Sequence, residues 1–398
     1  MNYVSIQKLV EHGHVAIKTG PFGTQLKASE YVSHGTPVLN VRNLGFATVN
    51  TEKLEMIGAE TLERLSAHKL MTGDIVFGRK GAVERHGFIS TDENGWMQGS
   101  DCIRLRVLTD AVNPRFLSYY FLTRRHKAFM INMCSHGTTM ASLNQKIIEK
   151  IEVPLPARPI QDKIVGLLSR FDKRIATNQK INKNLLEQAQ SIFTQEFLMF
   201  DRIPDGWQES SLLGIADYLN GLAMQKYRPK DDEQGLPVLK IKELRQGSCD
   251  FNSELCSPSI KPEYIVHDGD VIFSWSGSLL VDLWCGGTCG LNQHLFKVTS
   301  STYDKWFYYA WTDHHLQKFA AIAADMATTM GHIKREELSK AEVLIPSQSD
   351  YDRIGGLLAP LYDLVIANRI ENRKLASLRD ELLPQLMSGQ LDVSEVSL

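Results

Sequence analysis

The sequence has 398 residues, of which 43% are hydrophobic and 23% charged, so it can bury the cores of about two or three domains. No apolar run approaches the length of about 18 residues that crosses a bilayer, and the first residues lack the layout of a secretory signal, so we expect neither a membrane nor a secreted protein. Six cysteines are too few for a disulfide framework in a chain of this size, which favours a reduced, cytoplasmic protein.

The formal net charge of −2 is unevenly distributed. Residues 1–150 carry 18 Lys and Arg against 13 Asp and Glu, whereas residues 205–345 carry 13 against 19. The first part could therefore attract a polyanion through its overall field. The second part could do so only through a local basic surface.

The chain repeats itself. GTPVLNVRNL at residues 35–44 recurs as GLPVLKIKEL at 235–244, and GDIVFGRKG at 73–81 recurs as GDVIFSWSG at 269–277. Further along, IEVPLP at 151–156 recurs as AEVLIP at 341–346. The period settles at 190 residues, which is too long for a solenoid repeat. Each copy is therefore the size of a domain.

Within each copy the predicted elements follow the same order. Short β-rich runs separated by Gly and Asn or Asp turns come first, followed by a helical pair at residues 116–130 or 306–324. A further helical stretch, a proline-bounded strand and one long helix complete the copy. These patterns predict an α+β fold made of two tandem-duplicated mixed α/β domains and two long helices.

The long helices carry heptad seams with two asparagines at matching positions in each copy. The seam positions are Phe171, Ile175, Asn178, Asn182 and Leu185 in the first helix, and Leu361, Val365, Asn368, Asn372 and Leu375 in the second. A helix over residues 160–197 would be about 57 Å long and unstable alone. We therefore expect the two helices to form an antiparallel coiled coil, although two separate core helices remain an alternative.

Domain boundaries follow from this order. We expect globular domains at residues 1–155 and 204–346, and long helices within residues 156–203 and 347–398. Pro360, which has no counterpart in the first copy, is expected to kink or restart the second helix.

The second module opens with IPDGW at residues 203–207, and the second long helix contains LLPQLMSG at 382–389. With the alternation of two globular regions and two long helices, the chain resembles the specificity subunit of a Type I restriction-modification system. The resemblance implies a non-catalytic protein whose two target-recognition domains each read one half of a bipartite, asymmetric site on double-stranded DNA. It also implies that the helices fix the gap and dock two methyltransferase subunits, and that the complex recruits restriction and translocase subunits.

Motifs for chemistry are absent from the sequence. GDIVFGRKG lacks the Lys-Ser/Thr ending of a phosphate-binding loop, and neither a dinucleotide fingerprint nor a zinc-protease motif occurs. Cys249 and Cys256 have six residues between them, and Cys285 and Cys289 have three. This spacing does not fit structural zinc, so buried thiols are the expected state. We expect no enzyme activity, no cofactor and no metal.

Candidate DNA-binding residues are chosen by side-chain chemistry. Arginine and lysine bind guanine edges and phosphates, whereas side-chain amides bind adenine edges. In the first copy they are Arg79, Lys80, Arg85, His86, Arg124, Arg125, Thr138 and Thr139, with Lys127 on the same basic helix face as Arg124. In the second copy they are Lys240 and Lys242, expected on a strand, and Ser274, Trp275, Ser276, Asn292, Gln293, His294, Thr328 and Thr329. The threonines could equally be helix caps, and the arginine-rich helix face could be a solvated surface.

A second hypothesis is a duplicated coiled-coil scaffold that joins protein partners without binding DNA. The acidic second half favours this alternative. The two globular modules and the flanking phrases favour the specificity subunit.

Overall fold

The computed structural model describes residues 3–21, 23, 25–134, 141–325 and 335–395, which divide into two units. Unit 1 contains Met1–Asp172 and Ser377–Leu398, and unit 2 contains Lys173–Ala376. The long helices α6 (Arg158–Phe197) and α11 (Gln348–Ser388) therefore contribute residues to both units. No helix in the described ranges is long and apolar enough to span a membrane.

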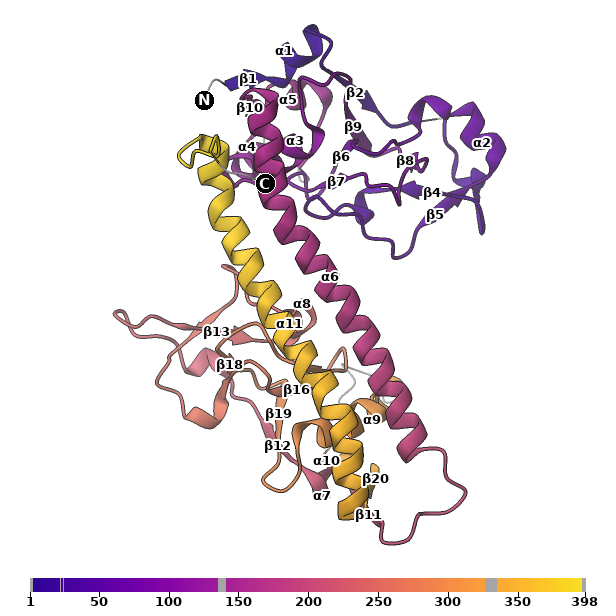
Figure 1. The fold of residues 1–398 in the computed structure, drawn as a ribbon, viewed down its shortest axis with the longest axis vertical. Helices are drawn as coiled ribbons and strands as arrows, with labels where there is room; N and C mark the ends of the chain where they lie inside the picture. Colours follow the sequence, from indigo (N-terminus) through magenta and orange to yellow (C-terminus); the bar gives the residue numbers. More distant parts are fainter. Residues whose placement is uncertain (1–2, 22, 24, 135–140, 326–334, 396–398) are drawn as a thin grey trace. The chain divides into compact units, whose positions relative to one another are not determined.

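Unit 1 contains two four-stranded sheets and a two-stranded one (Figure 1). The first sheet is antiparallel, with the spatial order β2 (Val15–Thr19), β9 (Cys102–Val107), β6 (Ile75–Gly78) and β7 (His86–Phe88). The second has the order β3 (Tyr31–Val32), β5 (Glu55–Ile57), β4 (Thr36–Leu39) and β8 (Met97–Gln98), with β4 and β8 parallel. The small sheet pairs β1 (Tyr3–Ser5) with β10 (Glu152–Pro154).

The core of unit 1 lies between the first sheet and the helices. The short helices are α1 (Ile6–Glu11), α2 (Ala59–Arg64), α3 (Pro114–Phe121), α4 (Arg124–Cys134) and α5 (Gln145–Glu149). Buried Ile75 and Phe77 from β6 pack in one cluster with Phe116 from α3. Leu383 and Leu386 of α11 belong to the same cluster, so the end of the second long helix completes this core.

Unit 2 repeats this plan. Its antiparallel sheet has the order β12 (Asp217–Asn220), β19 (Leu295–Thr299), β16 (Val271–Ser274) and β17 (Leu280–Leu283). Its second sheet has the order β14 (Leu255–Cys256), β13 (Leu236–Leu239), β18 (Cys289–Leu291) and β15 (Ile265–Val266), with β13 and β18 parallel, and β11 (Gln208–Ser211) pairs with β20 (Glu342–Ile345). Its short helices are α7 (Leu212–Ile215), α8 (Ile241–Gln246) and α10 (Arg335–Ser339). The predicted duplicated α+β architecture is confirmed.

The two copies differ in the helical segment that follows the first sheet. In unit 1 the Thr123 hydroxyl accepts a hydrogen bond from the His126 N–H, so α3 ends and α4 begins there. In unit 2 the equivalent Thr312 donates to the Tyr308 carbonyl one turn earlier and lies inside a single helix, α9 (Lys305–Asp325). Both hydroxyls donate back along the preceding turn, Thr123 to the Tyr120 carbonyl and Thr312 to the Tyr308 carbonyl, but only Thr123 also accepts from the N–H of a following helix. The predicted helical pair therefore occurs only in the first copy.

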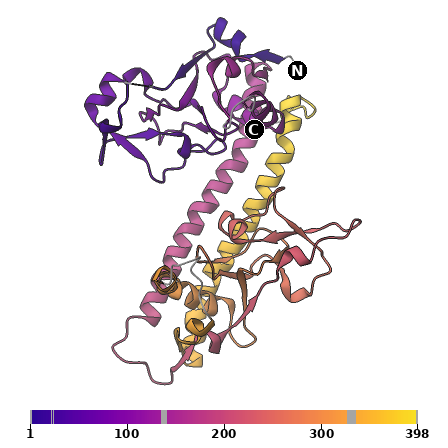
Figure 2. The same cartoon turned by 180° about the vertical axis from the view of Figure 1, so that it is seen from behind.

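Within unit 2, α6 and α11 pack against each other in opposite directions (Figures 1 and 2). Arg174 near the start of this part of α6 pairs with Glu371, at 3.0 Å, whereas Glu196 near its end pairs with Arg353, at 2.8 Å. The predicted antiparallel arrangement is confirmed. None of the ten seam residues is exposed, and Asn178, Asn182, Val365 and Asn368 are buried.

The seam asparagines bond to one another. Asn178 donates its amide N–H to Asn372 Oδ1 at 2.9 Å, and Asn368 donates to Asn182 Oδ1 at 2.8 Å. Asn178 is equivalent to Asn368 under the internal repeat, and Asn182 to Asn372, so the two contacts are symmetry-related versions of one. Because an asparagine facing leucine would leave its amide unpaired, these contacts favour a single register of the helices.

Helix α11 runs through Pro360 without a break, so the expected restart does not occur. Proline removes one backbone N–H and its ring crowds the carbonyl four residues earlier, which here belongs to Gly356. Gly356 is exposed, and a side chain built there would meet no atom within 4 Å. Water can therefore reach the freed carbonyl.

Arg373 connects α11 to the globular part of unit 2. Its Nη1 and Nη2 donate to the two carboxylate oxygens of Asp268, both at 2.7 Å, and Nη1 also donates to the Cys285 carbonyl at 2.6 Å. We expect Arg373→Ala to lower the free energy of unfolding of unit 2 by about 2 kcal/mol, because a bidentate charged contact on a half-buried side chain is lost. Denaturant unfolding of Arg373→Ala and of the exposed neighbour Lys374→Ala tests this. Equal effects of the two substitutions would contradict the assigned role.

Candidate nucleic-acid interface

Backbone hydrogen bonds hold the turn after β6, which exposes Lys80. The Arg79 N–H donates to the Asp101 carbonyl and the Arg79 carbonyl accepts from the Leu143 N–H, both at 2.8 Å. The Arg79 side chain is half-buried, whereas Lys80 is exposed and its Nζ lies 3.6 Å from an Asp101 carboxylate oxygen. Because exposed ion pairs are weak, the Lys80 ammonium remains able to bind a phosphate.

Beside this turn lies a residue that the sequence interpretation missed, Phe46, which is 44% exposed. The guanidinium carbon of Arg85 lies 5.6 Å from its ring centroid, and the Lys127 ammonium lies 4.4 Å from it. Arg85 and Lys127 are far apart in the sequence, and only the folded chain brings them together around the Phe46 ring. The signal in the sequence was a phenylalanine directly after a glycine in the polar stretch NLGFATVN.

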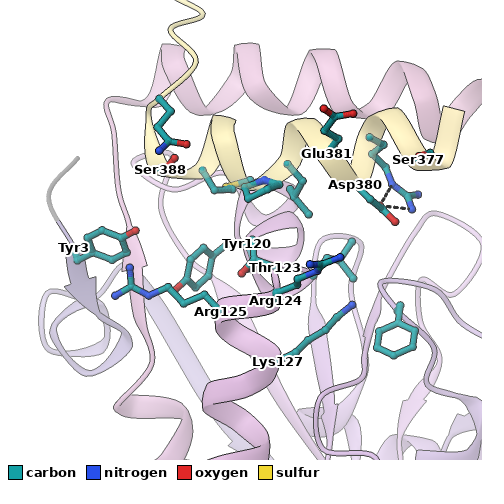
Figure 3. Close-up of a pocket in the computed structure, with 17 residues that line it drawn as sticks. Tyr3, Tyr120, Thr123, Arg124, Arg125, Lys127, Ser377, Asp380, Glu381 and Ser388 are labelled. Atoms are coloured by element: carbon teal, nitrogen blue, oxygen red, sulfur yellow. Dashed lines mark hydrogen bonds and ion pairs between the residues drawn. The ribbon is translucent and has the colours of Figure 1, made fainter. Parts of the chain in front are cut away.

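A hollow of about 950 Å³ in unit 1 adjoins the cluster (Figure 3). Its walls come from the first turn of α4, with Arg124, Arg125 and Lys127, and from the last turns of α11, with Asp380 and Glu381. Other lining residues are Tyr3, Phe46, Tyr120, Thr123, Arg379 and Ser388. The Arg125 guanidinium carbon lies 4.5 Å from the Tyr3 ring centroid.

The positively charged side chains around this hollow are available to bind a ligand. Among the described residues, none of Arg85, Arg124, Arg125 and Lys127 forms an ion pair. Burial lowers the pKa of Lys127, and the nearby Asp380 and Glu84 partly oppose that shift. Unpaired surface arginines next to exposed aromatic rings are typical of nucleic-acid contacts.

His86 is not placed to contact DNA, and that prediction is wrong. The side chain is fully buried between Phe77 and Phe121, and its Nε2 lies 2.9 Å from the Ser118 hydroxyl. Burial and the neighbouring His126 hold its pKa well below the usual value. His86 begins β7, where the alternation of the strand turns it into the core.

The second copy brings Trp275, His294 and Gln293 together at the end of the sheet formed by β12, β19, β16 and β17. The Trp275 indole N–H donates to Asn220 Oδ1 at 3.1 Å, and its ring centroid lies 6.2 Å from that of His294. The Gln293 amide nitrogen lies 3.3 Å from His294 Nε2. All three side chains are half-buried, so this group can offer ring faces and amide atoms to a ligand.

Three other candidates in this region have structural roles. Ser274, Ser276 and Asn292 are buried. The Ser274 hydroxyl donates to the Ser278 carbonyl at 3.0 Å, the Ser276 hydroxyl lies 3.2 Å from His294 Nδ1, and Asn292 Oδ1 accepts from the His294 N–H. They shape the turns that hold Trp275 and His294, so the prediction that they themselves contact DNA is wrong.

Lys240 and Lys242 do not lie on a strand. Strand β13 ends at Leu239, Lys240 precedes the first residue of α8, and Lys242 lies within that helix. Both ammonium groups pair with acids, Lys240 with Glu254 at 2.8 Å and Lys242 with Asp250 at 3.5 Å. Two alternating residues were too few to distinguish a strand from one helical turn.

Thr138, Thr139, Thr328 and Thr329 lie outside the described residues. The cysteines show nothing that binds metal, since the described part of the chain holds no group of three His, Cys, Asp or Glu side chains arranged for an ion. Five cysteines are buried and Cys249 is half-buried. Burial raises the pKa of Cys102 to about 12 and that of Cys285 to about 11, so neither thiol is reactive.

Both copies match one family model, described as the Type I restriction modification DNA specificity domain, over residues 36–187 and 204–378. The chain is 26% identical over 310 residues to the Type I restriction enzyme MjaIX specificity subunit of Methanocaldococcus jannaschii, covering 72% of this chain and 71% of that protein. It is 22% identical over 388 residues to the putative MjaX specificity subunit of the same organism, covering 90% and 88%.

A solved structure has the same fold. It is the Type I restriction-modification system S subunit from M. genitalium, which aligns over 97% of this chain and 96% of that chain with a TM-score of 0.56 and 12% identity.

Proposed function

Because the chain belongs to the family of Type I restriction modification DNA specificity domains, we propose that it is the DNA specificity subunit of such a system, with each module reading one half of a bipartite site. It has no catalytic role of its own. The observation that carries the proposal is the pair of family-matching modules with a common sheet topology and different side chains at the equivalent turns. Arg79 and Lys80 in one copy correspond to Trp275 and Ser276 in the other, so the half-sites would differ in sequence.

The proposed partners are two methyltransferase subunits and the restriction and translocase subunits, in the cytoplasm. The equivalent Asn178–Asn372 and Asn368–Asn182 contacts support the number of methyltransferase subunits, since a helix pair with internal two-fold symmetry offers two equivalent faces. We propose further that α6 and α11 set the gap between the half-sites, and that residues 1–155 and 204–346 are the recognition domains.

Methylation mapping tests the function directly. Cells that express the neighbouring methyltransferase gene with this chain should gain methylation at a bipartite motif with a fixed gap, and cells without the chain should not. Replacing Trp275 with alanine should alter only one half of that motif. An unchanged methylation pattern on removal of the chain would refute the proposal.

Salt dependence separates DNA reading from the scaffold alternative. We expect the affinity of the assembled complex for its site to fall by roughly 100-fold between 50 and 200 mM salt if four phosphates are contacted, because each contact releases condensed cations. Lys80→Ala should reduce the slope of log affinity against log salt by about 0.9, and Lys374→Ala should not change it. Fluorescence anisotropy measures both slopes. A scaffold would show no salt-sensitive binding.

A further inference from the structure

Phe46 is an aromatic side chain that the fold holds at the surface. Residues 44–49 form a narrow turn in which Leu44 bridges Val49 and the Gly45 N–H donates to the Thr48 carbonyl at 3.0 Å. Two further backbone bonds fasten this turn to the start of β7, from Ala47 N–H to the His86 carbonyl and from His86 N–H to the Gly45 carbonyl. A ring on a turn bonded at this many points has few positions to explore.

The backbone at this tip is strained. Ala47 has a φ of 58°, a conformation that a residue with a Cβ rarely adopts. Strain of this kind persists where surrounding contacts enforce it, and it gathers at binding sites. Here the two bonds to His86, itself buried and bound to Ser118, enforce it.

The surroundings of the ring are basic. Arg85 and Lys127 lie over it, Arg124 and Arg125 line the adjoining hollow, and the facing acids are Glu84, Asp380 and Glu381. An apolar ring bordered by unpaired cations complements one kind of polymer, in which stacked aromatic bases are bordered by phosphates.

The second copy has no phenylalanine at the position that matches Phe46. If the 200-residue offset of the repeated phrase is continued two residues past its end, the position matching Phe46 is Gln246, whose amide nitrogen lies 3.3 Å from the Ser248 hydroxyl and 3.4 Å from an Asp250 carboxylate oxygen. Any effect that depends on the Phe46 ring must therefore be confined to the half-site read by the first copy.

We propose that Phe46 is a wedge that inserts between two base pairs of the first half-site, while Arg85 and Lys127 bind the phosphates on either side. This proposal rests on the function proposed above. Insertion unstacks one base step locally, and the sequence dependence of that cost adds specificity at positions where no side chain reads a base edge.

The test uses the complex of this chain with its methyltransferase subunits on the site found by methylation mapping, with 2-aminopurine placed in turn at each step. Binding of the wild-type complex should raise fluorescence at one step of the first half-site, and Phe46→Ala should abolish that rise and weaken affinity by roughly tenfold. Phe46→Trp should restore both. If a methyltransferase subunit caused the increase in fluorescence, the increase would persist in Phe46→Ala. This variant therefore separates an effect of Phe46 from an effect of the methyltransferase.

The matched control is Phe251→Ala, because Phe251 is an exposed phenylalanine of the second copy, at 95% exposure. Phe46→Ala should leave the salt slope unchanged, since the ring contacts no phosphate, and Arg85→Ala should reduce it. Unaltered affinity and fluorescence in Phe46→Ala would overturn the wedge, as would loss of methyltransferase assembly with DNA affinity retained. Failure of the wild-type complex to bind any bipartite site would instead refute the proposed function.

Discussion

Replacing Asp172 with alanine is expected to lower the free energy of unfolding of unit 1 by about 3 kcal/mol, since it removes the shared partner of two partly buried cations. Asp172 Oδ2 accepts from the Tyr119 hydroxyl at 2.5 Å and from Arg115 at 3.0 Å, and Oδ1 accepts from Arg379 at 2.9 Å. Although burial raises it, the hydrogen bonds from Tyr119 and Arg379 leave the pKa of Asp172 below its usual value. The carboxylate is thus charged in the folded protein at neutral pH.

Hydrogen–deuterium exchange of α3 measures this prediction, because Arg115 and Tyr119 lie on that helix. The exposed neighbour Lys173→Ala serves as the control. Asp172→Asn should cost less than Asp172→Ala, since the amide oxygen still accepts a hydrogen bond. A change below about 1 kcal/mol for Asp172→Ala would show that the cluster contributes little to stability.

Acidification is expected to destabilise unit 1 through His126. Burial lowers the pKa of His126 to about 3, against about 6.5 in an unfolded chain. Below pH 6.5, His126 therefore becomes protonated in the unfolded chain but stays neutral in the folded protein. The free energy of unfolding consequently decreases as the pH falls from about 6.5 towards 3. Between pH 6.5 and 4.5 we expect a loss of about 2 kcal/mol from His126 alone, and His86 adds to it because its pKa is lowered as well.

A substitution isolates this effect. The His126 ring packs 4.7 Å from the Phe121 ring and its Nδ1 has no hydrogen-bond partner, so phenylalanine can replace it without loss of a bond. His126→Phe should flatten the dependence of unfolding free energy on pH in this window, measured by denaturant unfolding, and the exposed His34→Phe should not. An unchanged slope in His126→Phe would place the acid sensitivity elsewhere.

The large-scale organisation was readable from the sequence because it rests on repetition and periodicity. Repeated phrases 190 to 200 residues apart identified two modules, and spacings of three and four residues identified the helices that carry Asn178 and Asn368. The same four asparagines predicted a fixed register, and the structure shows why, since each pairs with another asparagine across the seam.

The binding surface was harder to predict, because exposure at the end of a strand depends on pairing and not on residue type. Ser274 ends β16 and His86 begins β7, and both side chains are buried, whereas the apolar side chain of Phe46 is exposed. Lys127 and Phe46 are 81 positions apart, and only the packing of α4 against the loops brings them together. At Pro360 the sequence rule failed for a local reason. Proline was expected to interrupt the helix, but the exposed Gly356 one turn earlier lets α11 continue through it.

Unit 1 is built from two segments that are far apart in the sequence, and this affects the order in which the chain can fold during synthesis. Its core includes Leu383, Leu386, Met387 and Val393, which are translated more than 200 residues after Asp172 and after all of Lys173–Ala376 in unit 2. The module translated first therefore finishes folding after the module translated second, which reverses the usual order in which domains mature. A nascent chain lacking Ser377–Leu398 would hold a completed unit 2 and an open apolar site in unit 1, so chaperones should engage the older half of the polypeptide.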